Sequence, residues 1–288
     1  MLKTAGVTVE NLGQHSLQAL RVENEFCSAL IALQGAQVVE FTQKQMQKPL
    51  LWCSELNSYQ QGKAIRGGIP LCFPWFGANP VHADHPSHGF ARNLPWQWVG
   101  ADVNESGHHL VFELRDSAET RKYWDFAFCL QMTIHCGAEL QLELNLNNLD
   151  PHDFEFGFAW HSYFPTDIRT TQISGLMGES YIDQLDHNAI KQQDAEWIQF
   201  TAETDRIYAT TQGQFVLQQN PQQHILIQSN AKSAVIWNPW IEKAARLNDV
   251  RDDAWQDFVC IECGQIATQT QKLQSGQHIK FQMKIAKK

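Results

Sequence analysis

The sequence has little positive charge. Its 288 residues include 22 lysines and arginines against 31 aspartates and glutamates, which gives a net charge of −9. A nucleic-acid-binding protein normally carries a basic patch, and the basic residues here are scattered along the chain. We therefore expect no nucleic-acid partner, and a few local arginines must hold any small anion that binds.

Long apolar runs are also missing. No window approaches the roughly eighteen continuous apolar residues that indicate a membrane-spanning helix, so no membrane association is expected. Residues 1–20 lack the apolar segment of a secretory signal peptide. The seven cysteines are an odd number without regular spacing, which favours reduced thiols in a cytoplasmic protein.

Apolar and polar residues alternate in several long stretches of the chain. These stretches are residues 109–116, 126–136, 139–149 and 278–286. Alternation of this length predicts strands with one buried face. The sequence SALIALQGAQVVEF, residues 28–41, predicts two further strands joined at Gly35.

Helical signals are few, and only residues 241–255 are expected to hold one or two short turns. No repeat and no linker divides the chain, so residues 1–288 are predicted to form a single domain. Many short strands with few helices favour an all-β fold, a large antiparallel β-sandwich. Two Gly/Pro-rich aromatic segments, residues 62–95 and 237–242, are expected to be loops that carry function.

His161 lies within the aromatic stretch GFAWHSYF, residues 157–164. If residues 154–161 form a strand, Phe158 and Trp160 share one face and His161 points to the other. The imidazole is then free to line a cleft on the opposite face of the sheet. The alternative is a structural histidine that is hydrogen-bonded to the backbone.

Glu262 lies in FVCIECG, residues 258–264, between Ile261 and Cys263. A carboxylate in so apolar a strand is costly to bury without a partner, and partial desolvation makes it a better base. The alternative is a structural glutamate in a salt bridge. Cys260 and Cys263 face opposite ways in a strand and no second such pair exists, so neither redox nor zinc chemistry is predicted.

His82, His85 and His88 are spaced three residues apart, a pattern that can suggest a metal site. Pro86 argues against the helix that would align them. A solvated loop with one functional histidine is therefore the preferred interpretation, and no metal is predicted.

Arg66 precedes two glycines in the segment KAIRGGIPLCFPWFG, residues 63–77. Such a loop lets the backbone approach a ligand, and an arginine fork suits a phosphate or carboxylate. A tight turn with a surface arginine explains the pattern equally well. Asp205, next to Arg206, is by default part of a local ion pair or a turn cap.

Six motifs together resemble the aldose 1-epimerase-like proteins, specifically the hexose-6-phosphate 1-epimerase branch. In the order of the chain they are KAIRGGIPLCFPWFG (63–77), HGFAR (88–92), HSYF (161–164), ETDRIY (203–208), WNPW (237–240) and VCIECG (259–264). The sequence departs from the family pattern at Ser162, where threonine is frequent, and at Cys263, where proline or alanine is common.

The resemblance implies a galactose-mutarotase-like β-sandwich with an open cleft. It implies that His161 is the general acid and Glu262 the general base, and that neither a metal nor another cofactor is needed. It further implies substrate-binding roles for four residues: His88 and Asp205 at sugar oxygens, and Arg66 and Arg92 at a 6-phosphate.

The implied reaction is the interconversion of the α and β anomers of hexose 6-phosphates, chiefly glucose 6-phosphate. The expected partner is the small-molecule sugar phosphate, and the protein is expected to be a monomer. Two alternatives stay open at this point. One is an aldose 1-epimerase that acts on non-phosphorylated sugars, and the other is a non-catalytic carbohydrate-binding sandwich.

Overall fold

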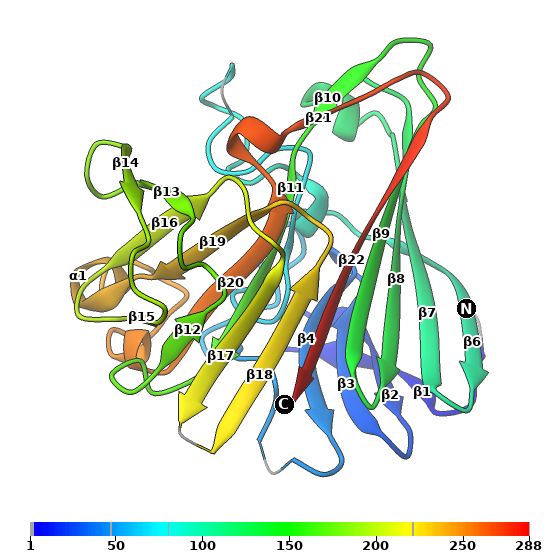
Figure 1. The fold of residues 1–288 in the computed structure, drawn as a ribbon. Coiled ribbons are helices and arrows are strands. Elements are labelled where there is room, and N and C mark those ends of the chain that lie inside the picture. Colours follow the sequence, from blue (N-terminus) through cyan, green and yellow to red (C-terminus); the bar gives the residue numbers. More distant parts are fainter. Residues whose placement is uncertain (1–2, 47, 80, 221, 288) are drawn as a thin grey trace.

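The protein is built almost entirely of antiparallel strands (Figure 1). The structure is a computed structural model that describes residues 3–46, 48–79, 81–220 and 222–287. Its two large sheets have nine and seven strands, and a four-stranded sheet is formed by the N-terminal part of the chain. This architecture confirms the predicted all-β fold with few short helices.

The nine-stranded sheet runs in the order β15-β12-β17-β18-β22-β9-β8-β7-β6. Its strands are β6 (Gln97–Asn104), β7 (Gly107–Arg115), β8 (Phe128–Gly137), β9 (Leu140–Asn148), β12 (Gln172–Ser174), β15 (Ile198–Gln199), β17 (Gln214–Asn220), β18 (Gln223–Ser229) and β22 (His278–Lys287).

The seven-stranded sheet runs in the order β14-β13-β16-β19-β20-β11-β5. Its strands are β5 (Leu71–Cys72), β11 (Phe158–Pro165), β13 (Ser180–Asp183), β14 (Ala189–Gln192), β16 (Thr204–Tyr208), β19 (Ser233–Asn238) and β20 (Phe258–Gln265).

The remaining strands form two smaller sheets, and the helices are short. The strands are β1 (Val7–Leu12), β2 (Leu17–Glu23), β3 (Cys27–Ala32), β4 (Gln37–Gln43), β10 (Phe154–Phe156) and β21 (Gln271–Leu273). The only α-helix among the described residues is α1 (Trp240–Ala244), and single 3₁₀ turns cover Ala91–Asn93, Thr120–Lys122, Ala254–Gln256 and Ala267–Gln269.

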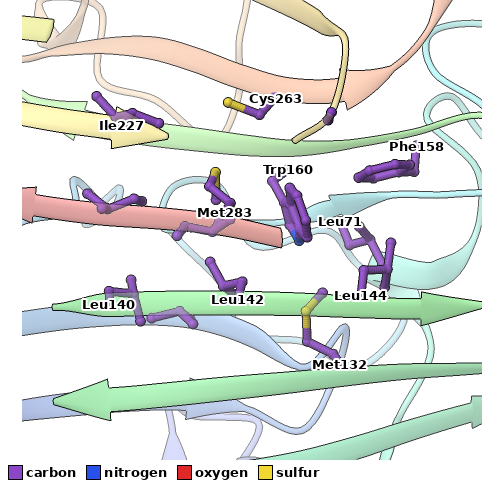
Figure 2. Packing of buried hydrophobic residues seen from close by; sticks show 14 of the residues in the cluster. Leu71, Met132, Leu140, Leu142, Leu144, Phe158, Trp160, Ile227, Cys263 and Met283 are labelled. Carbon is purple, nitrogen blue, oxygen red and sulfur yellow. The ribbon is translucent and has the colours of Figure 1, made fainter. Parts of the chain in front are cut away.

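The alternation seen in the sequence is the alternation of burial in the sheets. Along β9 the leucines are buried and the polar residues between them are partly exposed. Figure 2 shows the result: Leu142 of β9, Met283 of β22 and Trp160 of β11 meet in one apolar cluster between the two large sheets. The predicted pair of strands around Gly35 is also present, as β3 and β4.

The two faces of the seven-stranded sheet have different roles. Phe158 and Trp160 of β11 lie in the main core, and so do Val259 and Ile261 of β20. The residues between them therefore point to the opposite face of the sheet. This geometry directs His161 away from the main core, as the alternation predicted.

Residues 237–242 do not form the expected loop. The strand β19 continues through Asn238, and α1 begins at Trp240, one residue after Pro239. Proline fixes its own φ near a helical value, which is why it can stand at the start of a helix. Residues 62–95 match the expectation better, because the described part of this segment, 62–79 and 81–95, contains only β5, one 3₁₀ turn and isolated bridges. None of the helices in the described ranges could span a membrane.

Gly68 fixes the loop that carries Arg66 against the strands behind it. Its φ is +62°, and a Cβ atom at this position would lie 2.1 Å from the carbonyl oxygen of Val38. Its own carbonyl accepts a hydrogen bond from the Tyr163 N–H at 2.9 Å. The loop is thereby joined to both β4 and β11.

Replacing Gly68 with alanine is expected to lower the free energy of unfolding by roughly 2–4 kcal/mol, because the change adds a backbone clash to an unfavourable φ. The matched control is Gly62→Ala, where φ is +81° and nothing lies within 4 Å of the added Cβ. That variant should lose only about 1 kcal/mol. Urea unfolding measures both, and equal losses would show that the contact with Val38 is unimportant.

Candidate active site

A cleft of about 1010 Å³ opens on the face of the seven-stranded sheet that points away from the main core. Residues of β11, β16, β19 and β20 lie along one side of it, and the loop of residues 74–88 lies along another. Five of the six predicted site residues line this cleft. They are Arg66, His88, His161, Asp205 and Glu262.

His161 and Glu262 face each other across two neighbouring strands. They are direct register partners of β11 and β20, and both side chains reach the cleft. His161 Nε2 lies 3.3 Å from Glu262 Oε1. The residues are 6% and 2% exposed. His161 Nδ1 and Glu262 Oε2 are buried atoms that have no hydrogen-bond partner among the described residues.

The two members of the buried pair have pKa shifts in opposite directions. Burial, reinforced by His88, lowers the pKa of His161 well below its usual value. Burial, reinforced by Asp205, raises the pKa of Glu262 well above its usual value. A nitrogen and an oxygen at 3.3 Å need a proton between them to avoid repulsion. With this proton in place the pair presents one proton donor and one acceptor, and the two groups titrate as a unit.

His88 is held as a neutral donor. The Gly77 N–H donates a hydrogen bond to His88 Nδ1 at 3.2 Å, so Nδ1 is an acceptor and the proton of the neutral ring lies on Nε2. Burial and the nearby Arg92 and Arg66 lower the pKa of His88 to about 3. The ring centroid lies 5.8 Å from that of His161. The residue has a φ of +64°, a strained backbone of the kind found at functional sites.

Asp205 is held by two neighbours that the sequence did not indicate. Gln184 Nε2 donates to Asp205 Oδ1 at 2.6 Å, and Lys243 Nζ lies 3.5 Å from Oδ2. Lys243 also pairs with Glu203 at 3.1 Å. Burial raises the pKa of Asp205, and the Lys243 ammonium opposes that shift. Gln184 and Lys243 line the cleft as well, so this edge of the site carries several hydrogen-bonding groups.

Arg66 is already engaged by groups of the protein. Its Nε donates to Asp249 Oδ2 at 3.1 Å, and its Nη1 donates to the Tyr163 hydroxyl at 3.0 Å. The side chain is 23% exposed, so the guanidinium also reaches the cleft. The ring of Tyr163 stacks on that of His161 with centroids 4.7 Å apart. The ring of Tyr163 therefore connects the guanidinium of Arg66 to the imidazole of His161.

Arg92 is the predicted site residue that does not line the cleft. Its Nη2 donates to the carbonyl oxygen of Ser87 at 3.0 Å, on the segment that leads to His88. Its charge nevertheless acts on the site, because it lowers the pKa of His88, His161 and Glu262. Arg92 thus holds the segment that leads to His88 and acts on the site through its charge.

The three loop histidines have different surroundings. His88 and His82 both line the cleft, and His82 also forms, with Asp84 and His85, a cluster whose ligand atoms lie within 4.8 Å of one another. The rings of His82 and His85 are stacked with centroids 4.5 Å apart, and His85 packs on Trp75. The sequence interpretation, a solvated loop with one functional histidine, stays a prediction.

Aromatic side chains on the cleft wall add stacking surfaces. Trp75 and Phe76 come from the loop, Trp124 from the segment before β8, and Trp237 from β19. Aromatic faces of this kind are suited to pack against the apolar faces of sugar rings. Among these, Trp237 lies in the WNPW motif. Because Lys243 follows it by six residues, this motif was the one feature of the sequence that could have suggested that Lys243 lies near the cleft.

Comparisons with known proteins agree with this geometry. The profile of the family described as "Aldose 1-epimerase" matches residues 18–286. An Escherichia coli (strain K12) protein, provisionally named a glucose-6-phosphate 1-epimerase, is 32% identical over 278 residues, which cover 94% of this chain and 92% of the relative. A Cenchrus ciliaris protein with the same provisional name is 30% identical over 82% of this chain and 74% of its own length.

A solved structure shows the same fold. The crystal structure of a Salmonella typhimurium protein, provisionally named a mutarotase, superposes with a TM-score of 0.92 at 30% identity and covers 99% of this chain and 95% of its own. The chain described here belongs to the aldose 1-epimerase family. By class it is an epimerase, and its β-sandwich is of the galactose-mutarotase-like type.

Proposed function

We propose that this protein interconverts the α and β anomers of hexose 6-phosphates, chiefly glucose 6-phosphate. The observation that carries the proposal is the His161–Glu262 pair, in contact at 3.3 Å in a cleft of sugar-binding size that Arg66 also lines. The names of the relatives from Escherichia coli and Cenchrus ciliaris support the phosphorylated substrate.

Ring opening needs one proton removed from the C1 hydroxyl and one delivered to the ring oxygen. In the ion-pair form of the couple, the Glu262 carboxylate takes the C1 proton and the His161 imidazolium protonates the ring oxygen. Each positioned acid or base contributes typically ~10²–10⁴-fold to the rate. The products are the open-chain aldehyde, a neutral imidazole and a protonated carboxyl group.

The pair then stands in the form that burial favours. A neutral imidazole and a protonated carboxyl group are the states that desolvation of His161 and Glu262 stabilises. Rotation about the C1–C2 bond presents the other face of the aldehyde. Closure runs the proton transfers in reverse: the Glu262 carboxyl protonates the carbonyl oxygen and His161 accepts the C5 hydroxyl proton. The couple returns to its starting form without exchange with solvent.

The other cleft residues hold the sugar. His88, as a neutral Nε2–H donor, would bind a sugar oxygen near C1, and Asp205 would accept hydrogen bonds from sugar hydroxyls. Arg66 would bind the 6-phosphate, and Arg92 would support that site electrostatically from behind the loop. Holding the open form in place is as important as the acid and base, since a misplaced aldehyde closes slowly.

The test of the substrate is the exchange between anomers at equilibrium, followed by NMR exchange spectroscopy of the anomeric protons. We expect kcat/KM for glucose 6-phosphate to exceed that for glucose by at least about 100-fold, from charge-assisted hydrogen bonds of roughly 1.5–3 kcal/mol each. Equal values would assign the enzyme to neutral sugars. Binding of either sugar without any accelerated exchange would leave only a carbohydrate-binding sandwich.

One observation favours the neutral-sugar alternative. Arg66 is paired with Asp249, and Arg92 stays out of the cleft, so the cleft as it stands presents little uncompensated positive charge. In that function Arg66 would hold Tyr163 and, through it, the ring of His161 in place. The comparison of the two sugars separates these possibilities directly.

Replacing Lys243 with methionine is expected to raise KM about tenfold with a smaller effect on kcat. The buried Asp205 would lose its cation, so its pKa would rise further and the carboxylate that binds hydroxyls would protonate. The loss in KM should therefore be larger at pH 5 than at pH 8. Lys243→Arg should restore KM.

The matched control for Lys243 is Lys191→Met. Lys191 bridges Asp183 and Asp186 on the β13–β14 hairpin, outside the cleft lining. The Lys191→Met variant should have the wild-type KM at both pH 5 and pH 8. A Lys243→Met variant whose KM does not depend on pH would contradict the role given to Lys243.

We further propose a cytoplasmic location and a monomeric state. All seven cysteines are free, which is typical of proteins in a reducing compartment. A sugar phosphate as substrate points to the same compartment, because such charged metabolites do not cross membranes unaided.

A further inference from the structure

Cys260 lies directly beneath the acid–base pair and has no part in the proposed ring opening. It stands two residues before Glu262 on the same face of β20 and is fully buried. One donor atom from each of His161, Cys260 and Glu262 lies within 4.8 Å of the other two. We propose that these three residues form an inhibitory site for a soft divalent cation such as Zn²⁺ or Cd²⁺.

The geometry of the pair suits such an ion. His161 Nε2 and Glu262 Oε1 are 3.3 Å apart. With a Zn²⁺ ion at about 2.0–2.1 Å from both atoms, the N–Zn–O angle would be roughly 105–110°, which is close to the tetrahedral angle. The Cys260 sulfur must move inward by no more than roughly 1.3 Å to reach the edge length of a tetrahedral site. The fourth position is left for a water.

Charge balance favours the ion in so buried a place. The metal-free site holds two protons, one on the Cys260 thiol and one shared by His161 and Glu262, and it is neutral. Binding of a divalent cation releases both protons and leaves a thiolate, a carboxylate and a neutral imidazole around it, so the site stays neutral. A net charge, which would be costly to bury, never arises. Affinity should accordingly rise with pH, by up to ~100-fold per pH unit.

The donor set also selects the metal. A thiolate with an imidazole and a carboxylate favours Zn²⁺ and Cd²⁺ over the hard cations Mg²⁺ and Ca²⁺. His161 and Glu262 line the cleft and Cys260 lies beneath them, so the ion enters by the route that the sugar uses. Inhibition should therefore be competitive with substrate.

The experiment combines a binding measurement that needs no activity with an inhibition assay. Cd²⁺ is titrated into the wild-type protein while the ultraviolet thiolate-to-cadmium charge-transfer band is followed, and Zn²⁺ is tested as an inhibitor of anomer exchange. We expect one Cd²⁺ bound with the band, and competitive inhibition by Zn²⁺ but not by Mg²⁺. Cys260→Ser should remove the band and weaken Zn²⁺ inhibition by at least roughly 10–100-fold.

Two variants provide matched controls. Cys263→Ser alters a buried cysteine of the same strand on the opposite face, and it should keep both the band and the inhibition. The double variant His82→Ala/His85→Ala removes the other metal-binding candidate at the rim and should also keep both. Cys260→Ala serves as a second variant if Cys260→Ser does not fold, as judged by circular dichroism.

The proposal is overturned if the band persists or Zn²⁺ inhibits as strongly as in the wild type in a folded Cys260 variant, or if the band or the inhibition is lost in the rim variant instead. Cd²⁺ binding without thiolate character would overturn it as well. Because the band does not depend on any sugar, a failure of the proposed substrate leaves this result intact. A failure of the metal site likewise leaves the comparison of glucose 6-phosphate with glucose unaffected.

Discussion

Replacing Glu262 with glutamine is expected to lower the catalysed rate of anomer exchange by roughly 10²–10⁴-fold. The amide keeps the shape of the side chain but cannot take a proton from the C1 hydroxyl. Substrate affinity should change much less than kcat, because the amide oxygen still accepts hydrogen bonds. NMR exchange rates at saturating substrate measure the effect. The control is Glu155→Gln, a cleft-lining carboxyl away from His161 that should stay active.

The same variant should unfold less readily than the wild-type protein at neutral pH. Burial raises the pKa of Glu262 in the folded state, whereas the unfolded carboxyl ionises near ~4.3. Above that pH the folded protein retains a proton that the unfolded chain releases, so the wild-type stability falls as pH rises towards the folded pKa. Glutamine removes this loss, and its advantage should grow with pH to roughly 0.5–2 kcal/mol.

Urea unfolding at pH 5 and pH 8 tests this sign. The gain in the free energy of unfolding from Glu262→Gln should be small at pH 5 and larger at pH 8. A variant that is less stable than wild type, or whose gain shrinks as pH rises, would mean that Glu262 is ionised in the folded resting state. His161→Asn is a second test of activity. It removes the other member of the pair and should lower the rate of anomer exchange about as much as Glu262→Gln does.

The strands could be predicted from the sequence because burial in a two-sheet fold has a period of two residues. That period assigned His161 to the face away from the core without knowledge of any partner, whereas it left the face of Glu262 open. Their register contact was beyond reach, because the pairing of β11 with β20 joins segments about a hundred residues apart and no local pattern encodes it. The open choice between a structural and a functional role at both positions reflected this limit.

Residues that belong to short connections were harder to predict. Asp205 was read by default as the partner of its neighbour Arg206, yet in the fold its carboxylate meets Gln184 and Lys243 instead. Lys243 lies on α1, within the segment where short turns were expected, but that expectation did not indicate that its side chain reaches a cleft. Arg92 shows the reverse case, because the resemblance implied direct binding of the phosphate and Arg92 is not among the residues that line the cleft.

Replacing Arg66 with methionine is expected to lower kcat/KM for glucose 6-phosphate by roughly 10–100-fold while changing that for glucose far less. One or two charge-assisted hydrogen bonds to the phosphate, of roughly 1.5–3 kcal/mol each, would be lost. The aliphatic part of methionine retains much of the packing of the arginine stem. The measurement is the ratio of the two kcat/KM values. A general disturbance of Tyr163 and His161 would lower kcat/KM equally for both sugars and leave this ratio unchanged.

Asp249 supplies the control that separates phosphate binding from a structural ion pair. It occupies Arg66 Nε at 3.1 Å and competes with any anion for the same guanidinium. Asp249→Asn should therefore tighten the binding of glucose 6-phosphate, seen as a lower KM, and leave glucose unchanged. If Arg66 only holds Tyr163 in place, both Arg66→Met and Asp249→Asn would change kcat/KM for the two sugars in parallel. The phosphate would then have to bind elsewhere in the cleft.

Arg92→Met is a further test. A residue that acts only through its charge, without contact with the phosphate, should lower kcat/KM modestly for both sugars. The preference for glucose 6-phosphate that Arg66 sets should be preserved.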